Sequence, residues 1–250
     1  MIDLQKAQKA FLEYTNNYDL NNANITRKIS HSIRVMDYSK RIAENINLTK
    51  EQVDLATLIG LLHDIARFEQ WTRYETYNDS TSIDHGDFAV EILKENDFIR
   101  NFIDTDIYDD IIYTAIKNHN KYKIEELEGE KLIQAQIIKD ADKLDIYYQI
   151  ATQYFKDPRK TETEDISDEF FEEFKQEQCV HKRPNPTEID ELILIVSFIY
   201  DIYFNYSFRI LNDEKFIERI FAQFDFKKPD VKEKIDKIIK QANTYIKNKM

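Results

Sequence analysis

The chain has 250 residues and a formal net charge of −12, and its composition excludes several classes of protein. The acidic balance argues against broad attraction to nucleic acid or anionic lipid, because surfaces that bind phosphate polymers are built from clustered Lys and Arg. Hydrophobic residues make up 42% of the chain, yet 3 Gly and 4 Pro are too few for the many tight turns of a β architecture. We therefore predict an all-α globular protein whose partners are neither nucleic-acid polymers nor membranes.

The cysteine content indicates a reducing compartment. The one cysteine, Cys179, cannot form an internal disulfide, and the N-terminal residues lack the long apolar stretch of a signal peptide. No apolar run approaches the length of a transmembrane helix. We expect a cytoplasmic protein, with self-association into a homo-oligomer left open.

The chain begins with two predicted helices. Apolar residues at helical spacing predict the first over residues 3–15. The second, over about 27–47, places His31 on the stripe of residues that should face the interior. Thr49-Lys50-Glu51-Gln52 then has the form of a capping box and should start a third helix.

The third predicted helix is the most hydrophobic of the N-terminal half and ends at the adjacent residues His63 and Asp64. The following segment, residues 69–81, is polar and aromatic without clear periodicity. We interpret it as a loop that could close over a site. A further helix should follow and carry His85.

Two more helices complete the predicted N-terminal half. Residues 104–119 show apolar steps of three and four that lead to His119, and a helix over about 130–150 carries Asp142. Residues 166–248 predict three or four further helices. We expect one helical domain over 1–250, a helical bundle with a core at about 25–150 and a helical C-terminal extension at about 166–250.

A recurring set of histidines and aspartates lies on the apolar faces of these helices. Imidazole nitrogen and carboxylate oxygen together suit Mn, Fe, Zn or Co better than Ca, which prefers oxygen ligands alone. Because a carboxylate has two oxygens, Asp64 could bridge two divalent ions. Two ions bridged in this way can bind phosphate oxygens and generate hydroxide near neutral pH. The predicted metal ligands are His31, His63, Asp64, His85, His119 and Asp142.

Five motifs contain these residues: HSIRV at His31, LLHDIAR at His63 and Asp64, IDHGDFAVEIL at His85, AIKNHN at His119 and IIKDADKLD at Asp142. With these motifs, residues of about 25–150 resemble the HD-domain superfamily of metal-dependent phosphohydrolases, and the resemblance implies an HD-domain helical bundle. It implies that one metal is held by His31, His63, Asp64 and Asp142. A second would be held by His85 and His119 across a bridging Asp64.

Two positions need comment against the family pattern. The last metal ligand of the family resembles the Asp of an Ala-Asp-basic triplet, and Asp142 matches this triplet. Asp140 is the alternative. Residues two apart on a helix point in different directions, so only one of the two should face the metal. Three positions after Asp64 the chain has Arg67, which is similar to the Lys of HDxxK-type members. Many 5′-deoxynucleotidases of the superfamily have an acidic residue there, so a deoxynucleotidase is disfavoured. Arg67 is therefore a candidate phosphate clamp.

These features predict a phosphohydrolase acting on a small phosphorylated metabolite, with a nucleotide as the favoured substrate class. Metal-bound hydroxide would attack phosphorus, Asp64 would position the metals, and Arg67 would neutralise charge on the phosphoryl oxygens. A di-iron oxygenase and a non-enzymatic metabolite sensor are the alternatives. Weaker candidates for substrate contacts are Arg27, Lys121, Lys143 and Arg183.

Overall fold

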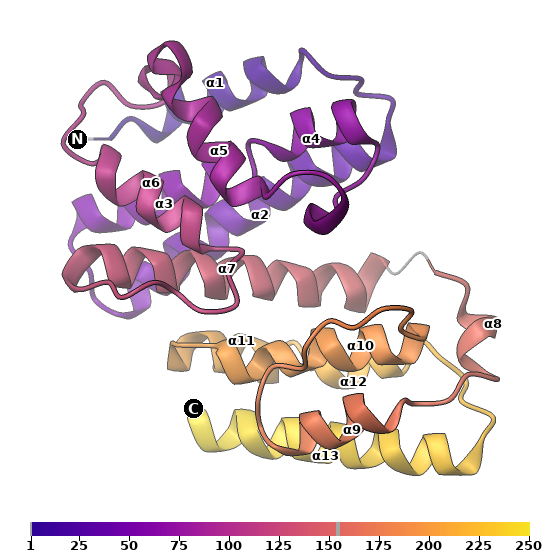
Figure 1. Cartoon of the computed structure of the whole chain (residues 1–250). Helices are drawn as coiled ribbons and strands as arrows, with labels where there is room; N and C mark the ends of the chain where they lie inside the picture. Colours follow the sequence, from indigo (N-terminus) through magenta and orange to yellow (C-terminus); the bar gives the residue numbers. More distant parts are fainter. Residues whose placement is uncertain (1, 154–155) are drawn as a thin grey trace. The chain divides into compact units, whose positions relative to one another are not determined.

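The computed structural model describes residues 2–153 and 156–250, and these residues form helices, turns and loops without a β-strand (Figure 1). The predicted all-α fold is confirmed. None of the helices in these ranges is long and apolar enough to cross a membrane. The chain divides into two compact units, Met1–Asp142 and Lys143–Met250, called here the N-terminal and C-terminal units. A single domain over 1–250 stays a prediction.

The N-terminal unit contains seven α-helices, the last of which continues past its boundary. Two short 3-10 helices lie between them, η1 (Asp79–Thr81) and η2 (Glu95–Asn101). The α-helices are α1 (Leu4–Thr15), α2 (Ala23–Asn45), α3 (Lys50–Leu62), α4 (Arg67–Tyr74), α5 (His85–Lys94), α6 (Asp109–Asn118) and α7 (Gly129–Gln153).

Two predicted boundaries in this unit were wrong. Residues 69–74, expected in a loop, belong to α4. This helix is short and has few buried positions, so its sequence shows no apolar periodicity. The helix expected from residue 104 begins only at Asp109, because Thr105 accepts a hydrogen bond from the Ile107 backbone in a preceding turn. Both errors leave the position of the histidines unchanged.

Helix α3 forms the centre of the N-terminal unit. It starts with the predicted capping box between Thr49 and Gln52, and every residue from Val53 to Leu62 is buried. A helix that is buried all round must be covered by others, and α2 packs closely along it. Gly60 permits this approach, because a Cβ atom there would lie 2.6 Å from Ser39 Oγ and 3.0 Å from Met36 Cα on α2.

We predict that Gly60→Ala destabilises the N-terminal unit. The added methyl group must push α2 away from α3, and overpacking of this kind costs about 1–3 kcal/mol. Urea unfolding should show the loss, whereas Ser30→Ala on the exposed side of α2 should stay within about 0.5 kcal/mol of the parent. An unchanged unfolding midpoint for Gly60→Ala would contradict this prediction, because it would show that α2 and α3 accommodate the added methyl group without strain.

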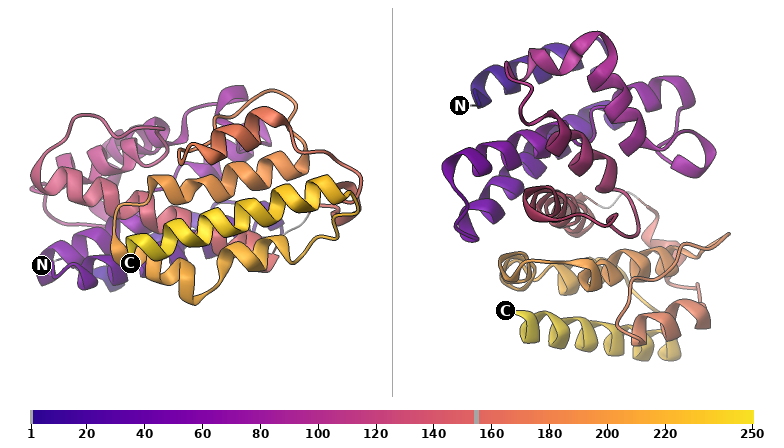
Figure 2. Two further views of the ribbon diagram at one scale, coloured as in Figure 1. Left: turned by 90° about the horizontal axis from the view of Figure 1, so that it is seen from below. Right: turned by 60° about the vertical axis from the view of Figure 1, so that its left-hand side comes forward.

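The C-terminal unit is also helical. Besides the end of α7 it contains the short α8 (Pro158–Thr161) and the 3-10 helix η3 (Ser197–Asp201). Its longer helices are α9 (Asp168–Lys175), α10 (Glu188–Val196), α11 (Asn205–Asp213), α12 (Phe216–Phe221) and α13 (Pro229–Lys249). Both α11 and α12 pack against α13, which runs along them in the left view of Figure 2.

The expected three or four helices after residue 166 are in fact five, α9 to α13, in this described stretch. The extra break separates α11 from α12 at Lys215, which adopts a left-handed backbone conformation (φ 50°). Because Lys carries none of the turn preference of Gly or Asn, the sequence does not show this break.

A buried carboxylate in the C-terminal unit predicts a pH effect. Glu173 accepts hydrogen bonds from the His181 backbone N–H (3.1 Å) and from Arg183 Nη1 (2.7 Å). Burial alone would raise its pKa, but His181 and Arg183 hold the pKa of Glu173 below the ordinary value of 4.5. Ionised Glu173 therefore contributes fully to the free energy of unfolding above pH 4.5, and this contribution is lost as the pH falls through the pKa of Glu173 in the folded state.

We expect Glu173→Gln to be less stable than the parent near pH 6 by about 1–2 kcal/mol, with the gap closing below pH values of about 4. Urea unfolding of both proteins between pH 6 and pH 3 measures the gap. A gap that does not change with pH would refute the ionic origin of the effect.

Candidate metal centre

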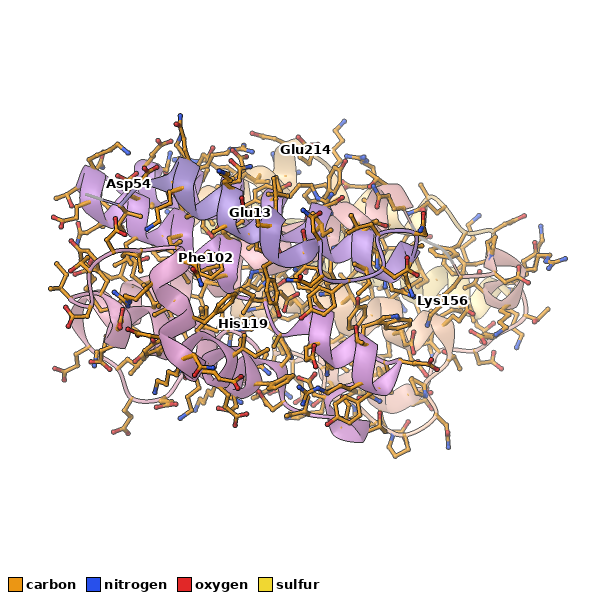
Figure 3. All side chains as sticks on the ribbon, turned by 90° about the horizontal axis from the view of Figure 1, so that it is seen from above. Glu13, Asp54, Phe102, His119, Lys156 and Glu214 are labelled. Atoms are coloured by element: carbon orange, nitrogen blue, oxygen red, sulfur yellow. The ribbon has the colours of Figure 1, made fainter. Side chains whose placement is uncertain are left out.

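Five helices and the residues at their ends bring the predicted ligands together within the N-terminal unit. His31 lies on the buried face of α2 and Asp142 on α7, while His85 is the first residue of α5. His63 and His119 occupy equivalent positions, each directly after the C-terminal end of a helix, α3 and α6. His119 lies among the interior side chains of this unit (Figure 3).

The first group of ligand atoms surrounds His31 Nε2. This nitrogen lies 3.2 Å from His63 Nε2, 3.2 Å from Asp142 Oδ1 and 3.3 Å from Asp64 Oδ2. His63 Nε2 is in turn 3.7 Å from Asp64 Oδ2 and 3.8 Å from Asp142 Oδ1. Two nitrogens and two carboxylate oxygens therefore converge on one point.

The second group uses the other oxygen of the same aspartate. Asp64 Oδ1 lies 3.5 Å from His85 Nε2 and 3.7 Å from His119 Nε2, and these two nitrogens are 3.0 Å apart. His119 also belongs to a set with His63 and Asp142 whose ligand atoms all lie within 4.8 Å of one another. Asp64, only 2% exposed, thus faces a histidine pair with each of its oxygens.

The ring nitrogens that face away from the centre determine which nitrogen can bind a metal. His63 Nδ1 donates to the Gly60 carbonyl (2.8 Å), and His119 Nδ1 donates to the Ile116 carbonyl (2.6 Å). Since a carbonyl only accepts, Nδ1 carries the proton of each neutral ring, and Nε2 presents a lone pair to the centre. His85 Nδ1 is held in the same way by Asp79 Oδ2 (2.5 Å).

This arrangement fits bound cations. In the neutral rings, His85 Nε2 and His119 Nε2 both present lone pairs across 3.0 Å, with no proton to place between them. Such a contact is repulsive unless a positive charge lies beside it. Imidazole nitrogens and carboxylate oxygens are together the donor set of divalent first-row metals.

The charge states also favour metal binding. Burial lowers the pKa of His63 below its ordinary value, and burial together with Arg67 lowers the pKa of His85 to about 4. Burial would raise the pKa of Asp64, but Lys28, His63 and Arg67 hold it well below the ordinary range. Burial would likewise raise the pKa of Asp142, which His31 and His63 instead keep low. At neutral pH, His63 and His85 are therefore neutral imidazoles, and Asp64 and Asp142 are ionised carboxylates.

Two cationic side chains flank the shared aspartate. Lys28 Nζ lies 2.6 Å from Asp64 Oδ2, and Arg67 Nε lies 3.4 Å from Asp64 Oδ1. Both cations also lie near the Tyr77 ring, 5.3 Å and 5.5 Å from its centroid. Sequence analysis missed Lys28, although its position three residues before His31 places it on the same helix face.

The other predicted substrate contacts lie in different environments. Arg27 bonds to Asn24 Oδ1 (3.0 Å) on its own helix, and Lys121 pairs with Asp84 and Asp87 (2.7 and 2.8 Å). In the C-terminal unit, Lys143 pairs with Asp201 (2.5 Å), and Arg183 with Glu173. Their roles in substrate binding stay predictions.

The two candidate closing aspartates, Asp142 and Asp140, differ in their position relative to the histidines. Asp142 belongs to the ligand sets that the described residues form, and Asp140 does not. This matches the choice suggested by the Ala-Asp-basic triplet. His181, expected in a loop, lies in one and pairs with Glu173.

The fold and this centre define an all-α protein with a cluster of histidines and aspartates that could hold a metal ion. Residues 29–147 match the family model of the HD domain, and the chain therefore contains an HD domain. Proteins with this domain are generally metal-dependent phosphohydrolases. No match to the chain is found among curated proteins or among solved structures.

Proposed function

We propose that the protein is a phosphohydrolase that uses two divalent ions to cleave a small phosphorylated metabolite, with a nucleotide as the favoured class. The observation that carries the proposal is the position of Asp64, whose two oxygens each face a different pair of histidine Nε2 atoms. A carboxylate placed in this way can bridge two ions. His31, His63 and Asp142 would complete the first ion site, and His85 and His119 the second.

Divalent ions at these positions would polarise phosphoryl oxygens and lower the pKa of a water molecule, which is the chemistry that phosphoester hydrolysis needs. The chain's own groups prepare this chemistry. The hydrogen bonds at Nδ1 of His63, His85 and His119 keep each Nε2 free of a proton. The four histidines and Asp64 are buried away from bulk water, whereas Asp142 is partly exposed.

Lys28 and Arg67 are the groups suited to stabilise charge on the phosphoryl oxygens. Lys28 Nζ uses one of its hydrogens for Asp64 and can donate others to a phosphoryl group. Arg67 Nη1 donates to Gln70 Oε1, the Tyr77 carbonyl and Asp79 Oδ1, so its guanidinium is held in one orientation. A cation fixed before the reaction stabilises a transition state without reorganisation.

The test is phosphate release by protein that has been stripped with a chelator and reloaded with Mn²⁺. The substrates are nucleotides, dinucleoside polyphosphates and sugar phosphates, and Asp64→Asn is assayed beside the parent. Asp54→Asn is the matched control, because Asp54 is a buried aspartate of α3 that pairs with Lys50 instead of facing the histidines.

Release that Asp64→Asn abolishes and Asp54→Asn retains would support the proposal and identify the substrate class. Oxygen consumption with bound iron and without phosphate release would replace it with the oxygenase. A protein that binds a metabolite without turning it over would replace it with the sensor.

A further inference from the structure

We propose that Asp79 is a positioning residue for the second ion site, holding the His85 ring in its ligand orientation and the Arg67 guanidinium beside it. The inference rests on the proposed binuclear function and adds to it a residue that no sequence pattern indicates. Asp79 begins η1, in the segment that connects α4 with α5.

Both oxygens of Asp79 are engaged, each toward a different part of the centre. Oδ2 accepts from His85 Nδ1 (2.5 Å) and from Asn120 Nδ2 (3.2 Å). Oδ1 accepts from Arg67 Nη1 (3.0 Å) and from Gln70 Nε2 (3.0 Å). One carboxylate therefore connects a predicted metal ligand with the cation that faces Asp64.

His85 needs such a partner because of where it lies. His63 and His119 follow the ends of helices, and each donates Nδ1–H to a carbonyl three residues earlier in its own helix. His85 is instead the first residue of α5, where no preceding helical turn offers a carbonyl. Its ring orientation depends on a side chain from another segment.

Asn120, in the turn that follows α6, also supports Asp79. Its Nδ2 donates to Asp79 Oδ2 and to Asp84 Oδ1 (3.0 Å), and Asp84 caps α5. The amide lies so close to α5 that a Cβ atom at Gly86 would approach Asn120 Oδ1 to 2.6 Å. Asp79 therefore has hydrogen-bond partners from α4, from α5 and from the turn after α6. An aspartate that only faced solvent in a loop would not need these partners.

The role predicts a selective loss of metal. Removing a carboxylate that orients a ligating histidine typically lowers metal affinity about 10–100-fold. Asp79→Ala should therefore bind the second Mn²⁺ about 10–100-fold more weakly and keep the first ion. Asp79→Asn retains one acceptor oxygen and should fall between Asp79→Ala and the parent.

Calorimetric titration of the chelator-stripped full chain with Mn²⁺ measures both affinities. Electron paramagnetic resonance reports whether the two Mn²⁺ ions remain spin-coupled. Asp87→Ala is the matched control, because Asp87 is an acidic residue of α5 that pairs with Lys121 and not with His85. Retention of the first ion by Asp79→Ala also shows that the variant is folded.

The inference is supported if Asp79→Ala binds one Mn²⁺ with the parent's affinity, binds the other more weakly and loses the spin coupling between them. Asp87→Ala should retain both ions. Two ions bound by Asp79→Ala with the parent's affinities would overturn it, and so would a parent protein that binds only one ion. The proposed function fails separately, when the parent binds two ions but releases no phosphate from any substrate.

Discussion

Asp64→Asn should lose both metal ions together and lower phosphate release by at least about a thousandfold. Substitution of a residue that binds only one ion would cause the loss of that ion alone. Asp64 differs because Oδ2 faces His31 and His63, whereas Oδ1 faces His85 and His119. An amide offers one neutral oxygen and cannot bridge.

Elemental analysis of the purified protein gives the number of ions per chain, and the phosphate assay gives the rate. Asp54→Asn, which changes the buried aspartate of α3 that pairs with Lys50, should keep both. A single ion retained by Asp64→Asn would contradict the bridging arrangement, even if activity were lost.

Loading the stripped protein with Mn²⁺ should raise the free energy of unfolding of the N-terminal unit substantially. The apo centre holds two ionised carboxylates and several imidazole lone pairs at distances of 3.0–3.8 Å, and bound ions would replace these repulsions with attractions. Each site contributes about 2.7 kcal/mol when the free ion is at one hundred times its dissociation constant.

Urea unfolding with chelator and with Mn²⁺ measures this gain. Asp64→Asn should show almost none of it, and Asp79→Ala should show roughly the part that belongs to one ion. Equal unfolding midpoints for the stripped and loaded parent would mean that the centre does not bind Mn²⁺ under these conditions.

The six candidate ligands could be selected from the sequence because they lie on, or next to, helices with an apolar stripe or an apolar run. His31 follows the buried stripe of α2, and His63 follows the apolar helix α3. The structure brings together all six residues of the predicted set. Their order along the chain made the set recognisable, because the adjacent His63 and Asp64 and the four other residues come from five separate helical segments.

Lys28 and Asp79 could not be singled out in the same way. Lys28 lies beside Arg27, and only the rotation of α2 decides that Lys28, rather than its neighbour, faces Asp64. Asp79 lies in a segment without periodicity, and its partners are six to forty-one residues away in the chain. Contacts that depend on loop geometry leave no regular spacing in the sequence.

Helices α3 and α6 both end at the metal centre, with His63 and His119 as their next residues. The aligned peptide dipoles of a helix place roughly half a negative charge at its C-terminal end. Two such ends, added to the charges of Asp64 and Asp142, oppose the entry of a phosphate. Under the proposed function, the backbone therefore favours an order of binding in which cations enter first and the anionic substrate follows.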